Sequence, residues 1–222
     1  MMKLYPLLFL TEAQVFAAEA YKQGYVFVES VFDSKRTLVL LDKNQIKDAS
    51  GALRESGEGI VKGYISFTNP EAGSDVADVR STSAIKGWGP LLYQAAMKSI
   101  QPNWLASDTN LSEDANNVWN KMYEYSNLYE RKYIGNLSSD RYECCAFVFN
   151  SIPDEDEVAT EQSFLAFLKT QNVSPQKTGC FWAYRKLTHE PELDMMIKTG
   201  KAVLKAVGND QVLEWVSSTN LP

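Results

Sequence analysis

Short runs rich in β-branched and aromatic residues alternate with polar or glycine-rich stretches in the first part of the chain. This pattern is typical of β-strands that are separated by turns. The predicted strands cover residues 25–31, 37–41, 60–68 and 76–82. Residues 47–59 contain three glycines and are predicted to form a loop between two of these strands. The first part of the chain therefore predicts a meander of strands.

From Gly87 the spacing of the apolar residues changes to that of a helix. The residues that share one helical face in this segment are Leu91, Leu92, Ala95, Ala96, Ser99 and Ile100. Pro90 lies near the start of the segment and Pro102 lies just past its end, and both positions suit proline. The pattern predicts a buried amphipathic helix between the two prolines.

The rest of the chain continues with both patterns. In chain order, the predicted elements are a strand at 104–106, a helix through 115–123, a strand at 142–149, a helix at about 158–170, a strand at 180–187, and helices at 193–206 and 210–216. Near the amino terminus, Thr11 and Gln14 have the spacing of a capping box and predict a helix that ends near Gly24, rather than a signal peptide.

Together these elements predict an α/β (α+β) fold with a mixed, mostly antiparallel central sheet flanked by helices. Residues 1–188 are expected to form one domain. Residues 189–222 are expected to form a C-terminal helical extension that either packs on the same domain or makes a dimer contact.

The composition excludes several classes of protein. The chain has 222 residues, of which 45% are hydrophobic, so it can form a sizeable core and is not intrinsically disordered. It carries 22 Lys and Arg against 28 Asp and Glu, a net charge of −6. This balance argues against a nucleic-acid partner, because phosphate backbones are bound by clustered basic residues. The longest apolar runs are far shorter than the roughly 20 residues of a membrane-spanning helix, so no membrane partner is expected.

The cysteines and the histidine limit the remaining chemistry. Cys144, Cys145 and Cys180 are odd in number, and the adjacent pair would form a strained ring if oxidised, which favours a reducing compartment and a cytoplasmic location. His189 is the only histidine, so a histidine-rich metal site is excluded and no metal is expected.

The most informative stretch joins the predicted strand that ends at Thr82 to the helix that begins near Pro90. Between them, Ile85-Lys86-Gly87-Trp88-Gly89 supplies two glycines and a lysine. Backbone amides in a glycine loop, together with the partial positive charge of a helix N-terminus, suit a phosphate or pyrophosphate. A Gly-x-Gly turn into a helix is also a common tight connection, so the spacing alone leaves both interpretations open.

Taken with the residues that follow it, this stretch resembles the acyl-CoA-binding core of the GNAT superfamily of N-acetyltransferases. The family's motif, Gln/Arg-x-x-Gly-x-Gly/Ala after a strand and before a helix, is matched by Ala84-Ile85-Lys86-Gly87-Trp88-Gly89. Residues 86–93, 105–108, 112–115 and 118–119 look more narrowly like GNAT-like proteins encoded by tailed bacteriophages. The resemblance covers roughly residues 60–123 and implies a GNAT-like fold.

The resemblance also implies a cofactor and the residues that bind it. Acetyl-CoA would be the acyl donor, and the acyl group would pass directly to an amine acceptor. The backbone of Val79, Arg80 and Ser81 would pair with the pantetheine arm of CoA. The amides expected to hold the CoA pyrophosphate are those of Lys86, Gly87, Trp88 and Gly89.

Acyl transfer in this fold also needs a general base for the amine and an acid for the leaving thiolate. The family often has a tyrosine as thiolate acid in the later helix, where this chain has Trp119. Tyr123 lies one helical turn further along the same face and is the candidate acid. Asp78 and Asp108 flank strands and are the candidate bases. A core role for Tyr123, and turn or capping roles for the two carboxylates, remain open.

Two functions from different classes follow. The first is an N-acetyltransferase that acts on a CoA thioester and an unidentified amine in the cytoplasm, which would be the host cytoplasm for a phage-encoded protein. The second is a catalytically degenerate GNAT fold with a structural or interaction role, for example in a phage virion or in binding a host protein. Ala84, where the family has Gln or Arg, and Trp119 support the second. A homodimer is compatible with both.

Overall fold

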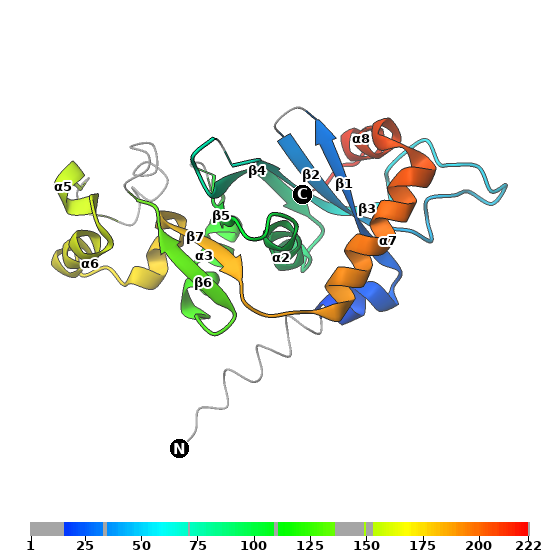
Figure 1. Cartoon of the computed structure of the whole chain (residues 1–222). Coiled ribbons are helices and arrows are strands. Elements are labelled where there is room, and N and C mark those ends of the chain that lie inside the picture. The colour runs from blue at the N-terminus through cyan, green and yellow to red at the C-terminus, as the bar shows by residue number, and fades with distance from the viewer. Residues whose placement is uncertain are drawn as a thin grey trace, which may run out of the picture. The chain divides into compact units, whose positions relative to one another are not determined.

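The strands form a mixed sheet in the computed structural model, which describes residues 16–32, 35–70, 72–108, 111–135, 149 and 153–221 (Figure 1). The strands are β1 (Tyr25–Phe32), β2 (Lys35–Asp42), β3 (Val61–Thr68), β4 (Val76–Ala84), β5 (Trp104–Ala106), β6 (Tyr129–Tyr133) and β7 (Trp182–Lys186). Their order in the sheet is β1-β2-β3-β4-β5-β7-β6. The β4–β5 pair is parallel, and the β1–β2, β2–β3, β5–β7 and β6–β7 pairs are antiparallel. The predicted mixed, mostly antiparallel sheet is therefore confirmed.

Helices flank this sheet, as predicted for an α+β fold. They are α2 (Gly89–Ser99), α3 (Glu113–Glu124), α5 (Glu155–Val158), α6 (Glu161–Thr170), the 3-10 helix η2 (Pro175–Phe181), α7 (Pro191–Val207) and α8 (Asn209–Ser217). Residues 16–22 are also helical, and the predicted start of that helix at Thr11 lies outside the described residues. Among the residues described, none of the helices combines the length and the apolar character needed to cross a bilayer.

The chain divides into two compact units. Unit 1 consists of residues 1–69, Arg80–Ser99 and 189–222, and unit 2 consists of Pro70–Val79 and Ile100–Thr188. The boundary falls within β4. The segment after residue 188, which the sequence analysis treats as an extension, is thus part of unit 1.

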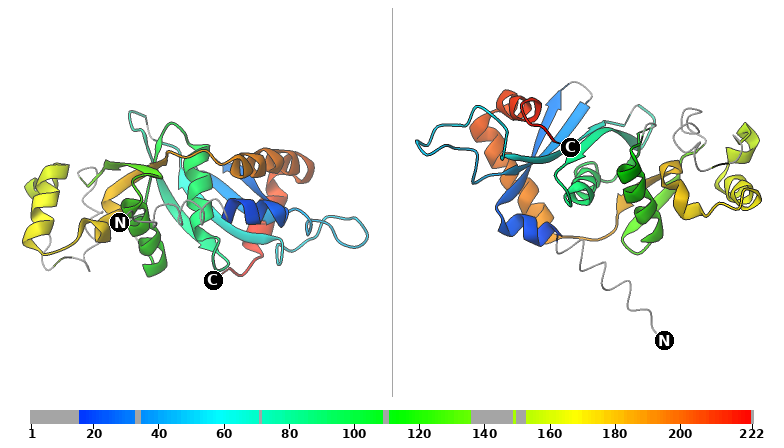
Figure 2. Two further views of the ribbon diagram at one scale, coloured as in Figure 1. Left: turned by 90° about the horizontal axis from the view of Figure 1, so that it is seen from below. Right: turned by 180° about the vertical axis from the view of Figure 1, so that it is seen from behind.

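Unit 1 is built on the antiparallel meander of β1, β2 and β3. Its strands are buried because helices cover them: α7 packs against β1, and α2 packs against β2 and β3. The views in Figures 1 and 2 show α7 running alongside β1. The close approach is possible because the residue of α7 that meets β1 is Gly200, where a Cβ would collide with the backbone of Phe27.

The last helix, α8, also packs on the sheet of unit 1. Val212 and Trp215 are fully buried in one cluster with Val26 and Val28 of β1 and with Val39 of β2. Covering the apolar face of a sheet in this way removes it from water and stabilises the unit. Both C-terminal helices therefore pack on the sheet of unit 1.

Unit 2 is organised around the β5-β7-β6 ladder. The helix α3 lies on one face of the ladder, where Trp119 packs against Tyr184 at 5.6 Å and Tyr123 packs against Trp182 at 5.1 Å between ring centroids. The opposite face carries a small apolar cluster of Val76, Ala106, Ile134 and Ala183. The side chains of unit 2 therefore form two separate layers, and Tyr123 lies in the layer under α3.

Two parts of unit 2 differ from the predicted elements. The sequence analysis has no strand at β6, because Tyr-Glu-Arg-Lys-Tyr lacks the apolar alternation that predicts strands. The helix predicted at about 158–170 is α6, which begins at Glu161 because Thr160 caps it through Ser163; the short helix α5 precedes it and was not predicted. Most of the strand predicted at 142–149 lies outside the described residues.

Cys180 is disulfide-bonded. Its side chain is buried, with 1% exposure.

Candidate functional site

The glycine loop is a tight turn between β4 and α2. The Trp88 N–H donates a hydrogen bond to the Ile85 carbonyl at 3.2 Å, and Gly87, the third residue of the turn, has a φ of 96°. A positive φ at the third position is the pattern of a type II β-turn, and it favours glycine. The helix α2 then begins at Gly89. The predicted strand, glycine loop and helix are confirmed as one local unit.

Three of the four amides proposed for pyrophosphate binding have no acceptor within the described residues. They belong to Lys86, Gly87 and Gly89. The Trp88 amide differs, because it closes the turn and cannot also donate to a ligand. A Cβ added at Gly87 or Gly89 would meet no atom within 4 Å, so the space beside the loop is open.

The charges around the loop favour an anion. The segment Arg80–Ser99 contains no Asp or Glu, and Arg80 and Lys86 lie near the loop in sequence. Its third cation, Lys98, lies in the last turn of α2 and pairs with Asp194. The first turn of α2 has no acidic residue of its own to offset the partial positive charge of the helix N-terminus. Aromatic contacts anchor the turn. The Trp88 ring packs on Tyr25 at 5.3 Å and on Phe16 at 6.4 Å between ring centroids.

The strand residues proposed for the pantetheine arm lie past the end of a short ladder. β4 pairs with β5 only at Val76, Ala77 and Asp78. Val79, Arg80 and Ser81 follow directly, beyond the last β5 partner on that edge. A strand edge without a neighbouring strand presents N–H and C=O groups that an amide-containing ligand could pair with.

Tyr123 is half-buried in an aromatic group of unit 2. Its ring packs edge-on against Trp182, and the guanidinium carbon of Arg131 lies 4.3 Å from the ring centroid. Burial raises the pKa of the Tyr123 phenol, Arg131 acts in the opposite direction, and Glu161 adds to the rise. The phenol is therefore a proton donor at neutral pH, as an acid for a thiolate must be.

The two candidate bases occupy different places. Asp78 pairs in register with Ala106, which belongs to the apolar cluster on the face opposite α3. Since paired residues of neighbouring strands point to the same face, the register places Asp78 on the opposite face from Tyr123. Asp108 lies two residues beyond the end of β5 and is partly exposed. The structure does not bring Asp78 and Tyr123 to one face.

The sequence analysis did not identify Asn116 on α3. Its side chain is buried, with 8% exposure, and its Oδ1 atom has no hydrogen-bond donor within the described residues. A buried acceptor without a partner is costly, so this oxygen is a polar atom that the described part of the fold leaves unsatisfied. Asn116 precedes Tyr123 by two helical turns, so both lie on one helical face. That spacing is the signal that could have found it.

The candidate cofactor and catalytic residues belong to different units. The loop Lys86–Gly89 lies in unit 1, whereas Asp78, Asp108, Asn116 and Tyr123 lie in unit 2. Val79 and Arg80 stand at the boundary. Each group is therefore described within its own unit.

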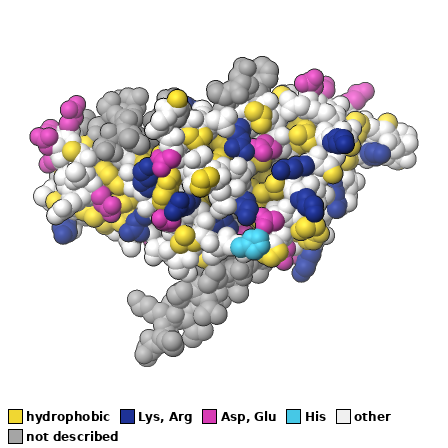
Figure 3. All heavy atoms as spheres, viewed as in Figure 1, with side chains coloured by type: hydrophobic (Ala, Val, Ile, Leu, Met, Phe, Trp, Pro, Cys, Tyr) yellow, Lys and Arg dark blue, Asp and Glu magenta, His cyan; other side chains and the backbone are white. Residues whose placement is uncertain are grey.

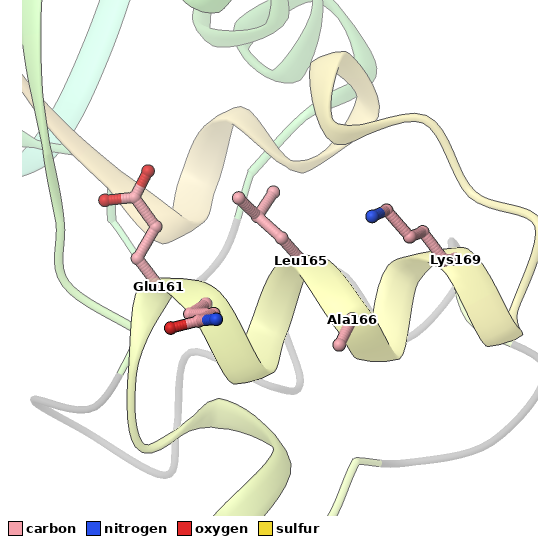
Figure 4. A pocket seen from close by; sticks show the side chains of 5 residues that line it. Glu161, Leu165, Ala166 and Lys169 are labelled. Atoms are coloured by element: carbon pink, nitrogen blue, oxygen red, sulfur yellow. The ribbon is translucent and has the colours of Figure 1, made fainter.

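Other features of the described residues are weaker candidates for a functional site. A shallow hollow along α6 is lined by Glu161, Gln162, Leu165, Ala166 and Lys169, all from the same helix (Figure 4). The single histidine, His189, is on the surface, with 68% of its side chain exposed (Figure 3). In the part of the chain that the structure describes, no three His, Cys, Asp or Glu side chains gather as metal ligands do.

Comparison with known proteins adds no identification. No protein-family model matches the chain, no curated protein matches it, and no solved structure matches it.

Proposed function

We propose that the protein is an acyl-CoA-dependent N-acyltransferase that transfers an acetyl group from acetyl-CoA to an amine. The observation that carries this proposal is the glycine loop. The amides of Lys86, Gly87 and Gly89 have no acceptor within the described residues, and the space at the Cβ positions of Gly87 and Gly89 is open. The loop lies at a helix N-terminus, in a segment without carboxylates. These are the properties of a site for a phosphate-bearing ligand.

The remainder of CoA would meet groups that fit it. The edge of β4 at Val79–Ser81 has no β5 partner, and the pantetheine arm carries the amide groups that such an edge pairs with. These residues and the resemblance of residues 60–123 to the GNAT superfamily support the same ligand.

The proposed reaction is a direct transfer. The amine nitrogen attacks the thioester carbonyl, a C–N bond forms and the C–S bond breaks. A carboxylate takes one proton from the nitrogen, and the Tyr123 hydroxyl gives its proton to the leaving sulfur, so that the products are an amide and the free thiol. Asp108 is the favoured base of the two, because Asp78 lies on the sheet face opposite Tyr123.

A second function follows from a different observation. The Trp88 amide is committed to the turn, and Ala84 stands where the family has Gln or Arg. A GNAT-like fold with a weakened cofactor site would serve as a structural or interaction protein, for example a phage virion or host-binding component, or as a homodimer. An enzyme would act in the cytoplasm, of the host if the protein is phage-encoded.

Isothermal titration with acetyl-CoA and with CoA tests the proposal. The variant is Gly89→Arg, because an arginine there would occupy the open space beside the loop without striking the protein. The control is Ala206→Arg, which adds the same side chain at an exposed position of α7. We expect both ligands to bind the natural protein and the control. In Gly89→Arg the affinity should fall by about tenfold or more, or about 1.4 kcal/mol.

Absence of binding by the natural protein at millimolar ligand would reject the enzyme and leave the structural role. Equal affinity in Gly89→Arg would place the CoA site elsewhere on the chain. Thermal unfolding of all three proteins shows whether either substitution disturbs the fold.

A further inference from the structure

Unit 2 contains two arginines that stack on aromatic rings but differ in their charge partners. Arg185 lies over Trp104, with its guanidinium carbon 4.5 Å from the ring centroid, and it pairs with Glu130 at 2.6 Å. Arg131 lies over Tyr123 at 4.3 Å and also faces Trp182 at 5.4 Å. Within the described residues, no carboxylate lies close enough to Arg131 to form an ion pair.

The hydrogen-bonding capacity of Arg131 is largely unused. Its only described bond is a long one, from Nη1 to the Tyr123 carbonyl at 3.5 Å. Stacking occupies the faces of a guanidinium, so the N–H groups at its edge remain able to donate. Two of these N–H groups can form parallel hydrogen bonds to one carboxylate. Arg131 is exposed, so a ligand can reach this edge.

The neighbouring groups are also donors. The Trp182 indole N–H is buried and has no acceptor within the described residues. Tyr123 contributes a hydroxyl whose raised pKa keeps it protonated. Among the described residues, the Glu161 carboxylate raises the pKa of Tyr123, and it does not form an ion pair with Arg131. Within the described residues, this group of Arg131, Tyr123 and Trp182 contains no carboxylate paired with the guanidinium.

The charge of unit 2 as a whole is opposite to that of Arg131. Unit 2 contains 8 Lys and Arg against 15 Asp and Glu, a net charge of −7, whereas unit 1 has 14 against 13. Figure 3 shows acidic and basic side chains interspersed over the visible face. An acidic surface attracts a cationic amine, and an unpaired arginine within it would hold a carboxylate on the same molecule.

We infer that Arg131 binds a carboxylate of the acceptor, and that the acceptor is an amine of the amino-acid type. The inference rests on the proposed function, in which the Tyr123 hydroxyl protonates the leaving sulfur. The acceptor nitrogen must then react close to Tyr123. The guanidinium of Arg131 stacks on that same ring, so a carboxylate one or two bonds from the nitrogen lies within its reach.

The test measures transfer to matched pairs of acceptors. Each of the common L-amino acids is compared with its carboxamide, and released CoA thiol is followed with a thiol reagent. The comparison uses the ratio of kcat/KM for acid and amide in each protein. The intrinsic reactivities of the two amines cancel when these ratios are compared between the natural protein and a variant.

The variants are Arg131→Gln, Arg131→Lys and the matched control Arg185→Gln, which removes a stacked but paired arginine. We expect the ratio for the best acceptor to fall by about 10- to 100-fold in Arg131→Gln. The ratio should fall less in Arg131→Lys, because lysine keeps the charge but lacks the paired N–H donors of a guanidinium. The ratio should stay unchanged in Arg185→Gln. Titration with acetyl-CoA should give the same affinity for all four proteins.

The outcomes separate this inference from the proposed function. Acetyl-CoA binding with an acid-to-amide ratio that Arg131→Gln leaves unchanged overturns the inference and leaves the transferase. Binding of acetyl-CoA without transfer to any amino acid also overturns it, because the acceptor class is then wrong. Absence of acetyl-CoA binding by the natural protein rejects the proposed function, and the inference with it.

Discussion

Gly200 of α7 lies directly against the main-chain carbonyl of Phe27 in β1. The contact joins a helix backbone to a strand backbone, so there is no room for a side chain at position 200. The contact sets how closely α7 approaches the sheet of unit 1. The face of α7 that contains Gly200 is buried, whereas Lys198, Lys201 and Lys205 are exposed to solvent.

Replacing Gly200 by Ala should destabilise the protein. Alanine is the better helix former by about 1 kcal/mol, so the same change on an exposed helix face would stabilise. Here the added methyl group meets backbone atoms that cannot rotate away, and overpacking of this kind costs about 1–3 kcal/mol. Denaturant unfolding measures the difference. An unfolding free energy equal to or above that of the natural protein would contradict the tight contact.

Replacing Trp215 by Phe should loosen the loop between β2 and β3. The Trp215 indole donates a hydrogen bond to the Arg54 carbonyl at 2.7 Å, and the ring is fully buried. The loss of this bond and of ring volume should cost about 1–3 kcal/mol. Hydrogen exchange should accelerate at the amides of Arg54–Gly57 more than in β1. Unchanged exchange in the loop would show that α8 does not hold it.

Replacing Gly87 by Ala should weaken acetyl-CoA binding. An L-residue at a φ of 96° is strained, so the turn that presents the loop amides would change. The matched control is Gly51→Ala, because Gly51 also has a positive φ of 87° and open space around it but lies in the β2–β3 loop. Both variants carry the same backbone strain, of about 1–2 kcal/mol. A loss of affinity by titration in Gly87→Ala alone would confirm that the loop binds CoA, whereas an equal effect in both would contradict it.

Replacing Tyr184 by Phe should change how stability depends on pH. Burial raises the pKa of the Tyr184 phenol well above its ordinary value, so the folded protein keeps its proton where the unfolded chain loses it. The unfolding free energy of the natural protein should therefore fall as the pH rises above about 10, by up to about 1.4 kcal/mol per pH unit from this group. In Tyr184→Phe this contribution disappears. Thermal or denaturant unfolding between pH 8 and about 11 measures both curves, and parallel curves would contradict the assignment.

Most strands and helices could be predicted because their apolar residues recur at a regular spacing. The strand β5 is so predicted at 104–106, and α2 is predicted between its two prolines. β6 could not be predicted, because it is a strand at the edge of the sheet. Its residues Arg131 and Lys132 are held by aromatic stacking and by an ion pair with Asp75, which no local pattern contains.

The candidate site could be predicted only in part. The loop residues Lys86–Gly89 follow from two glycines between a strand and a helix, and those signals are local. The sequence could not show that the Trp88 amide is used within the turn, because that depends on the φ of Gly87. It also could not show that Asp78 and Tyr123 fall on opposite faces, because that depends on the β4–β5 register.

The sequence by itself determined the fold class, the order of most elements and the glycine loop, because each depends on the spacing of residues along a few turns or one strand. Only the tertiary structure decided that α7 and α8 cover the sheet of their own chain, that Asn116 is buried with an unsatisfied oxygen, and that Arg131 stacks on Tyr123 without a described carboxylate partner. These three features depend on contacts between residues far apart in the chain. Such contacts are set by packing and hydrogen bonding in the folded protein, and they leave no periodic signal in the sequence.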